Sequence, residues 1–360
     1  MNAIILSGGG GTRLWPMGRH KKPKQYFPIV STKPMIVETY ERLLSGFKPE
    51  HIFFSTNSLQ AKVLRGLLPA LPPDHVITEP EKRDTAPAMI FSALHLLERA
   101  PNEPFVFIPS DHSIDSVKRF IATLSAGGEL VRETGKLVDI GVQASFPSTA
   151  LGYTHIGKRW KSVNGIEVYK FLGHTEKPDA ETATRYIKSG EYLWHANYYM
   201  WTPRKFVDAV ARCAPELKPV IEALRKAIKE GSARSIKKLF AQLPKISIDY
   251  LLAEKLDPSD VLVIKGDFGW SDIGAWDALY DQLLNAMTPD GNIARGQVEL
   301  HDTHNCLVYG SERKIIATIG LDNMIVVDTK DALLICPKGR AQDVKKIVAG
   351  LEQKGKKKFL

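Results

Sequence analysis

The sequence of 360 residues contains few cysteines and no long apolar run. Its three cysteines, Cys213, Cys306 and Cys336, are far apart and form no Cys-x-x-Cys motif, so we expect neither a disulfide framework nor a zinc site. No apolar stretch approaches the roughly 18 residues that a membrane span requires. Because no basic segment precedes an apolar one at the N-terminus, we expect no signal peptide and a reducing, cytoplasmic location.

The composition is that of a globular protein. Hydrophobic residues make up 44% and charged residues 25%, which excludes collagen, coiled coil and general disorder. Lys and Arg number 49 against 40 Asp and Glu, so the net charge is +9 and an anionic partner is favoured. The basic residues are scattered and match no nucleic-acid-binding module, so we expect neither a nucleic acid nor a membrane as partner.

The first third of the chain alternates apolar strands with amphipathic helices. Strands are predicted at 3–6, 52–54 and 105–108. Helices are predicted over 34–47, after Ser58 and after a Thr85 cap. Further strands are expected at 137–142, 165–171 and 261–264, with a helix capped by Asp179 and helical segments over 204–243. This order predicts an α/β fold with a Rossmann-like, mixed and mostly parallel sheet.

The pattern changes after about residue 288, where the helical period disappears. Short β-rich runs follow at 297–300, 306–309, 315–319, 324–327 and 333–336, separated by turn residues. We therefore predict a large domain over 1–288 and a small β domain over 289–351 that ends in a helix at 340–351. The basic tail at 352–360 is predicted to be disordered.

A glycine-rich turn follows the first strand. Gly8, Gly9, Gly10 and Gly11 precede Thr12-Arg13, and Pro23-Lys24-Gln25 comes shortly after. Glycines let backbone N–H groups approach phosphate oxygens, and Arg13 and Lys24 supply cations for a triphosphate. The spacing excludes a Walker A loop. The alternative is a tight turn beside a solvated basic patch at 19–22.

Two aspartates follow strand-like runs, which makes them candidate metal ligands. Asp111 follows the strand at 105–108, and Asp272 follows the one at 261–264. Ligands bind at the carboxyl ends of such strands, and Mg²⁺ prefers carboxylate oxygens. The alternatives are a helix cap for Asp111, at the start of a helical stretch, and a turn or cap before a helix at 274–285 for Asp272.

Several ordered motifs resemble one known family over essentially all of residues 1–351. They are Gly8 to Pro16 with Pro23-Lys24-Gln25, Glu79-Pro80 with Arg83 to Ala88, Pro109 to His112, Gly152-Tyr153, Glu176-Lys177-Pro178, Ile248-Asp249-Tyr250, Trp270 to Trp276, Asp328 to Ala332 and Val344-Lys345-Lys346. The string is similar to that of sugar-1-phosphate nucleotidyltransferases, in the form typical of mannose-1-phosphate guanylyltransferases.

The resemblance implies an enzyme that makes GDP-mannose and diphosphate from GTP and α-D-mannose 1-phosphate. It implies Mg²⁺ as the cofactor, with Mn²⁺ as a substitute. It further implies that the C-terminal domain is a short left-handed β-helix through which two copies form a homodimer. The alternatives are transfer to another sugar 1-phosphate, and a non-catalytic homologue that senses a nucleotide sugar.

The resemblance also assigns roles to residues of this sequence. The catalytic residues would be Arg13, Lys24, Asp111 and Asp272, of which Asp111 and Asp272 would bind the metal. The nucleotide would contact Leu6, Gly8, Gly9, Gly10, Gly11, Thr12, Arg13, Lys24, Glu79, Asp84, Thr85, Ser110 and Asp111. The sugar phosphate would contact Gly152, Tyr153, Glu176, Lys177, His195 and Asn197.

Two departures from the family pattern affect the expected specificity. Asp84 stands where the family usually has Asn, and an ionised Asp accepts but does not donate hydrogen bonds. His195-Ala196-Asn197 stands where the family often has Asn-Ser-Gly. We expect Asn197 to tolerate the backbone conformation of the usual Gly. His195 would contact the sugar or, alternatively, face the core behind it.

Overall fold

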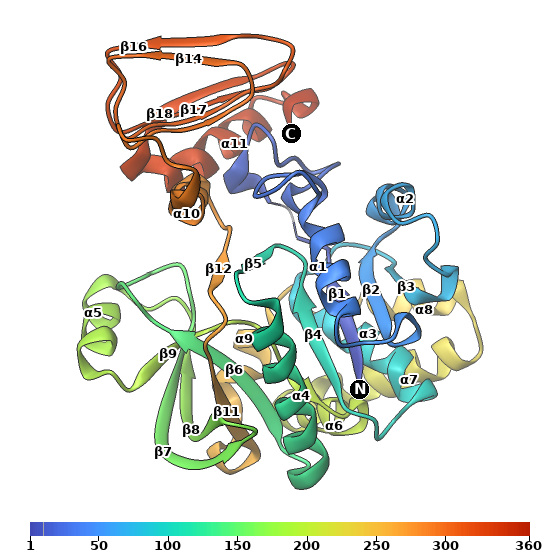
Figure 1. Cartoon of the computed structure of the whole chain (residues 1–360). Coiled ribbons are helices and arrows are strands. Elements are labelled where there is room, and N and C mark those ends of the chain that lie inside the picture. The colour runs from blue at the N-terminus through green and yellow to red at the C-terminus, as the bar shows by residue number, and fades with distance from the viewer. Residues whose placement is uncertain (10) are drawn as a thin grey trace. The chain divides into compact units, whose positions relative to one another are not determined.

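The computed structural model describes residues 1–9 and 11–360, so the predicted contact of Gly10 lies outside the described residues. The chain forms two compact units (Figure 1). Unit 1 comprises Met1–Gly8, Tyr40–Ser110 and Ile114–Trp270. Unit 2 comprises Gly9–Thr39, Asp111–Ser113 and Ser271–Leu360, so the glycine-rich segment and the C-terminal segment belong to the same unit.

Parallel strands form one half of the ten-stranded sheet of unit 1. Strand β1 (Asn2–Leu6) pairs in parallel with β2 (Ile52–Asn57) and with β4 (Phe105–Pro109), and β3 (Val76–Glu79) extends the sheet beside β2. The residues of β1 and β4 are almost all buried, as a sheet covered on both faces requires. The α/β class and these apolar strands are confirmed.

Antiparallel pairs complete the sheet, in the order β11-β8-β7-β9-β6-β10-β4-β1-β2-β3. Strand β6 (Leu137–Gln143) pairs in parallel with β11 (Val261–Gly266). Around it, β7 (Tyr153–Val163), β8 (Ile166–Thr175), β9 (Tyr192–His195) and β10 (Met200–Trp201) pair antiparallel. The sheet is thus mixed, as predicted, although the sequence analysis missed the long strand β7.

The helices of unit 1 are α2 (Ser58–Leu67), α3 (Thr85–Arg99), α4 (Val117–Thr134), α5 (Ala180–Ser189), α6 (Pro203–Cys213), α7 (Lys218–Lys229), α8 (Ala233–Phe240) and α9 (Ile248–Leu251). Two local expectations are wrong. Asp84, not Thr85, caps α3, because its carboxylate accepts from the Thr85 N–H at 2.7 Å. The residues after Asp111 form strand β5 (His112–Ile114) rather than a helix, and α4 begins after the Ser116 cap.

Unit 2 contains stacked parallel coils of a β-helix. Strands β13 (Ile293–Arg295), β15 (Leu307–Tyr309) and β17 (Met324–Asp328) pair in parallel, and β18 (Leu333–Pro337) closes this sheet antiparallel. A second parallel pair joins β14 (Val298–His301) to β16 (Ile316–Ile319), on the other side of the coils (Figure 1). The β-helix expected from the sequence is confirmed.

The residues that follow the glycine-rich turn pack against the C-terminal part of the chain within unit 2. Leu14, in the short helix Thr12–Leu14, and Trp15 share one apolar cluster with Trp276, in α10 (Trp276–Gln282), and with residues of the β-helix and α11 (Val344–Gln353). The Trp276 indole donates to the Trp15 carbonyl at 3.0 Å. The short helix α1 (Met35–Leu44) begins in unit 2 and continues into unit 1.

The basic tail differs from the predicted disorder. Residues Lys357–Phe359 form a short 3-10 helix, and the Trp15 indole donates to the Phe359 carbonyl at 2.8 Å. Leu360 is buried in the apolar cluster of unit 2. Among the described residues, no helix has the length and apolar character needed to cross a membrane.

We predict that Trp276→Phe destabilises unit 2. The smaller ring leaves a cavity in a fully buried position and removes the hydrogen bond to Trp15. The expected loss in the free energy of unfolding is about 2 kcal/mol. Denaturant unfolding monitored by circular dichroism measures it. Trp160→Phe, at a position 40% exposed in β7, is the control and should change stability by less than about 0.5 kcal/mol. Equal effects of the two substitutions would contradict the role of Trp276.

Candidate active site

A buried lysine is the centre of the first group of predicted site residues, all in unit 2. The Lys24 Nζ lies 3.0 Å from Asp111 Oδ2 and donates a second hydrogen bond to the Ile273 carbonyl. Its side chain is only 8% exposed. Burial alone would raise the pKa of Asp111, but the Lys24 ammonium outweighs it and holds this pKa below its ordinary value. The structure therefore brings Lys24 and Asp111 together as an ion pair.

Asp272 lies in the same charged neighbourhood, in strand β12 (Trp270–Asp272) rather than in a turn or cap. Burial raises the pKa of Asp272, the Lys24 and Arg13 cations oppose this, and the Asp111 carboxylate adds to it. Three of the predicted catalytic residues, Lys24, Arg13 and Asp111, thus act electrostatically on the fourth, Asp272. Two carboxylates that repel each other are a donor set that a hard divalent cation would stabilise.

Gly11 lies close to the backbone of Lys24, and Gly18 lies close to that of Gly11. Gly11 has φ +56°, and a Cβ there would lie 2.7 Å from the Lys24 backbone nitrogen. A Cβ at Gly18 would lie 2.3 Å from the Gly11 carbonyl oxygen. Both positions therefore require glycine for steric reasons. Thr12 and Arg13 follow in the short helix that begins after Gly11.

The predicted nucleotide contacts of unit 1 lie at strand ends and at a helix start. Leu6 ends β1, and its carbonyl accepts from the Ser110 N–H at 3.1 Å. Glu79 ends β3 and is buried next to Gly8, whose added Cβ would lie 3.5 Å from Glu79 Oε1. Burial raises the pKa of Glu79 to about 7, against a partly compensating hydrogen bond from Ser55 at 3.3 Å.

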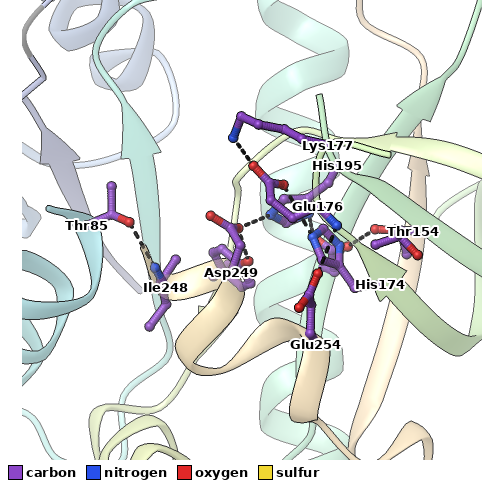
Figure 2. Close-up of polar contacts among 12 residues, drawn as sticks. Thr85, Thr154, His174, Glu176, Lys177, His195, Ile248, Asp249 and Glu254 are labelled. Carbon is purple, nitrogen blue, oxygen red and sulfur yellow. Dashed lines mark hydrogen bonds and ion pairs between the residues drawn. The ribbon is translucent and has the colours of Figure 1, made fainter. Parts of the chain in front are cut away.

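The start of α3 fixes two more predicted contacts. Asp84 has φ +74°, an unusual conformation for a residue with a side chain, and its carboxylate is used by the helix cap. The Thr85 Oγ1 accepts from the Ile248 N–H at 2.9 Å, which ties α3 to α9 (Figure 2). Both side chains thus have a structural task, and their nucleotide contacts stay predictions.

Two of the predicted sugar-phosphate residues, Lys177 and His195, lie near a third, Glu176, in unit 1 (Figure 2). The Lys177 ammonium contacts the Glu176 carboxylate, and His174 Nε2 lies 3.5 Å from Glu176 Oε2. Burial would raise the pKa of Glu176, but His174 and Lys177 bring it down to about 2. Lys177 has φ +49° immediately before Pro178, so its backbone is held in a rarely used conformation.

The remaining predicted sugar contacts have distinct surroundings. A Cβ at Gly152 would lie 2.4 Å from Glu176 Oε2, so a larger residue there would displace this carboxylate. The Tyr153 hydroxyl is bonded to the backbone of Ser148 at 2.9 and 3.1 Å. Asn197 has φ +57°, which confirms that it occupies a conformation suited to glycine. His195 is buried, with its two ring nitrogens towards Asp139 and Asp249.

The groups around His195 were not predicted from the sequence. Asp139 lies in an apolar strand, where a buried charged residue needs a partner. A buried ion pair at this position could therefore have been predicted from the sequence. Asp249 occurs in a motif that we quoted without assigning it a role. His174, Glu176 and Asp249 hold ligand atoms within 4.8 Å of one another. The Lys177 ammonium already neutralises Glu176, so we do not assign a metal to this cluster.

Two protein-family models match the chain. The one described as Nucleotidyl transferase matches residues 2–288, and the one described as MannoseP isomerase/GMP-like beta-helix domain matches residues 296–351. A mannose-1-phosphate guanylyltransferase of Escherichia coli is 34% identical over 362 residues, covering 98% of this chain and 76% of that protein. One of Klebsiella pneumoniae is 32% identical, covering 99% and 75%.

A solved structure resembles the whole chain. It is a Thermus thermophilus protein described as a mannose-1-phosphate geranyltransferase, with a TM-score of 0.86 and 30% sequence identity. The alignment covers 98% of this chain and 99% of that one. The likeness therefore extends over both units.

We predict that Glu79→Gln stabilises the protein at pH 8 more than at pH 5.5. The pKa of Glu79 rises from 4.5 to about 7 on folding, so the folded state holds a proton that the unfolded chain has lost over this range. The free energy of unfolding therefore falls as the pH rises from 4.5 to 7. Glutamine does not ionise, so the variant avoids this fall in the free energy of unfolding. The gain in the free energy of unfolding over the wild-type protein should be about 1–2 kcal/mol larger at pH 8 than at pH 5.5. Urea unfolding at the two pH values measures it.

Glu50→Gln is the matched control, because Glu50 is exposed. It should leave stability unchanged at both pH values. An effect of Glu79→Gln that does not depend on pH would contradict the buried, protonated state of Glu79.

Proposed function

The chain belongs to the nucleotidyl transferase family, and from that premise we propose that it transfers a guanylyl group from GTP to α-D-mannose 1-phosphate, giving GDP-mannose and diphosphate. The observation that carries the proposal is the group formed by Lys24, Asp111 and Asp272. The names of the Escherichia coli and Klebsiella pneumoniae relatives support guanine and mannose as the specific groups.

The main obstacle to this reaction is the electrostatic repulsion between the two negatively charged substrates. A sugar phosphate oxygen attacks the α-phosphorus of GTP in line, and diphosphate leaves. That oxygen is already ionised at pH 7, because the second pKa of a phosphate monoester is about 6. Each pair of like charges at 4 Å costs about 4 kcal/mol at an effective dielectric constant of 20. The protein must therefore position two polyanions and offset their repulsion.

The chain supplies cations and donors for this task. We assign Arg13 and Lys24 to the phosphates of GTP, together with backbone N–H groups of the glycine-rich segment. Lys177 is assigned to the phosphate of the sugar and Glu176 to a sugar hydroxyl. The pKa of about 2 for Glu176 supports this role, since an ionised carboxylate accepts hydrogen bonds at every working pH. Glu79, Asp84 and Thr85 are assigned to the nucleoside.

We assign Asp111 and Asp272 to a divalent metal, Mg²⁺ with Mn²⁺ as a substitute. The electrostatic effect of Asp111 on Asp272 supports the fit, because the Asp111 carboxylate raises the pKa of Asp272. When bound, a hard cation would stabilise the negative charge of the phosphates. Lys24 keeps Asp111 ionised and therefore ready to bind a cation.

The experiment that tests the proposed function is a matrix of substrates. The protein is mixed with each of four nucleoside triphosphates and with the 1-phosphates of mannose, glucose and galactose, and diphosphate release is measured. We expect the highest kcat/KM for GTP with mannose 1-phosphate. Glucose 1-phosphate should be used less well, because a polar pocket built for one hydroxyl is left unpaired by its epimer. Equal use of both sugars would reject the mannose preference, and no release with any pair would reject the enzyme.

Removing Asp272 should abolish most of the activity without unfolding the protein. We expect Asp272→Ala to lower kcat by about 10²-fold or more, because a charge-stabilising group is lost. Its folded pKa is raised, so stability should not fall. Chelation of divalent cations should silence the wild-type protein equally. Asp267→Ala, at a side chain 88% exposed, is the control and should leave kcat unchanged. A normal kcat for folded Asp272→Ala would contradict the assignment.

We propose that the protein is a cytoplasmic homodimer joined through the β-helix. Strand β18 is an edge strand, and its Leu333 and Ile335 side chains are 54% and 56% exposed, with Ile319 of β16 at 75%. Exposed apolar residues on an edge strand favour pairing with a second copy. The three free cysteines are compatible with a reducing compartment.

The dimer is tested by light scattering at micromolar concentration. The double substitution Leu333→Lys with Ile335→Lys should halve the mass, because two charges would face each other across the proposed contact. Leu172→Lys, at an exposed position of β8, is the control and should leave the dimer intact. A monomeric wild-type protein, or a dimer in the double variant, would contradict the proposal.

A further inference from the structure

A chain of buried charged groups lies beside Glu176 and has no task in the proposed function (Figure 2). Each ring nitrogen of His195, at the end of β9, lies within ion-pair distance of one carboxylate, although neither forms a hydrogen bond. Its Nδ1 lies 2.9 Å from Asp139 Oδ1, and its Nε2 lies 3.7 Å from Asp249 Oδ1. The exposed fraction is 1% for the His195 side chain, 5% for Asp139 and 10% for Asp249. The ring is therefore enclosed and does not line an open surface.

Each carboxylate also accepts a hydrogen bond from a hydroxyl group. Thr154 Oγ1, from β7, donates to Asp139 Oδ2 at 2.8 Å. The Tyr199 hydroxyl donates to Asp249 Oδ1 at 2.8 Å. The aromatic neighbours fix the ring of His195, with ring centroids 4.9 Å away in His174 and 4.8 Å away in Tyr199. The arrangement is thus built from β6, β7, β8, β9 and α9 together.

The two flanking carboxylates require a positive ring between them. Two buried carboxylates without a cation would be strongly unfavourable, and the protonated imidazole is the cation within ion-pair distance of both. Burial lowers the pKa of His195, but Asp139 and Asp249 outweigh it and raise this pKa to about 9. The charged and titratable groups that face the ring are Asp139, Asp249, Glu176, His174 and Tyr199.

Two neighbours, Asp249 and His174, link the His195 ring to the predicted sugar site. Asp249 lies within 4.8 Å of Glu176 and His174, measured between possible ligand atoms. His174 packs edge-on against His195 and meets Glu176 at 3.5 Å. Loss of the positive charge would release the Asp249 carboxylate and add repulsion between Asp249 and Glu176.

We propose that His195 is a positioning residue of the sugar-phosphate site: as a buried cation it holds Asp249, and through His174 it holds Glu176, in place to accept hydrogen bonds from the sugar hydroxyls. It acts through these neighbours and does not itself touch the sugar. The proposal rests on the proposed function for the identity of the ligand. It replaces the direct sugar contact expected of His195 from the sequence.

The first test compares His195→Gln with His155→Gln. His155 is a partly exposed histidine in β7 that stacks on Tyr192, so its replacement controls for the loss of an imidazole. We expect His195→Gln to raise KM for mannose 1-phosphate about tenfold or more, with KM for GTP changed less than about twofold. His155→Gln should change neither value. Equal increases in both KM values, or none, would overturn the positioning role.

The second test uses pH, because a purely structural role would not produce the expected profile. The raised pKa means that the stabilising charge is present below pH 6.5 and is lost as the pH rises through about 9. The kcat/KM of the wild-type protein for mannose 1-phosphate should therefore fall above pH 9. The kcat/KM of His195→Gln should not show this fall, because the variant has no imidazole to lose a proton. A parallel fall in both proteins would overturn the proposal.

Asp139→Asn keeps the test decisive if His195→Gln does not fold. It preserves the shape of the side chain and removes one of the two charges that hold the proton. The fall in kcat/KM should then move to lower pH. An unchanged profile in folded Asp139→Asn would contradict the role of this pair.

A measurement without turnover separates this proposal from the proposed function. The ring of His195 is followed by ¹H–¹⁵N NMR, and it should be protonated at pH 7.5. A neutral ring at this pH overturns the proposal even if the enzyme is active. A wild-type protein without activity on any substrate pair overturns the proposed function, while the NMR result still decides the charge of His195.

Discussion

Unit 2 depends on the neutralisation of one buried ammonium group. An isolated lysine with 8% exposure would be costly, and the Asp111 carboxylate and the Ile273 carbonyl offset this cost. These two partners come from segments far apart in the sequence. The Lys24 side chain therefore links both segments to the part of the chain that follows the glycine-rich turn. Gly11 and Gly18 are required for the same reason, because the backbone must pass within van der Waals contact of Lys24 and of itself. The apolar cluster of Trp15 and Trp276 then anchors this charged group to the β-helix.

Unit 1 buries negative charges where unit 2 buries a positive one. Its buried carboxylates, Asp139, Glu176 and Asp249, are balanced by His195 and by Lys177. Each of these groups would be unfavourable alone, whereas together they form a network in which each charge has a partner of opposite sign. Glu79 is the exception, since burial raises its pKa to about 7 and neighbouring groups oppose the shift only in part.

Much of the fold could be predicted because continuous apolar strands and amphipathic helices follow one another in order. Strand β7 could not, because most of its residues are partly or fully exposed and it contains no apolar run. The ordered tail near Phe359 and the short strand at His112 depend on contacts with distant segments rather than on local propensity. The candidate site was found through motifs, which locate Lys24 and Asp111 but not the pair that they form. The environment of His195 required the tertiary structure, since its carboxylate partners are distant from it in sequence.

The central claim is that a phosphate oxygen of the sugar attacks the α-phosphorus of GTP. Mannose 1-phosphate labelled with ¹⁸O in its non-bridging phosphate oxygens tests it most directly, with the products analysed by ³¹P NMR. The account predicts that ¹⁸O appears in the bridge between the two phosphorus atoms of GDP-mannose, with none in the released diphosphate. Label in the diphosphate, or release of inorganic phosphate in place of diphosphate, would contradict it.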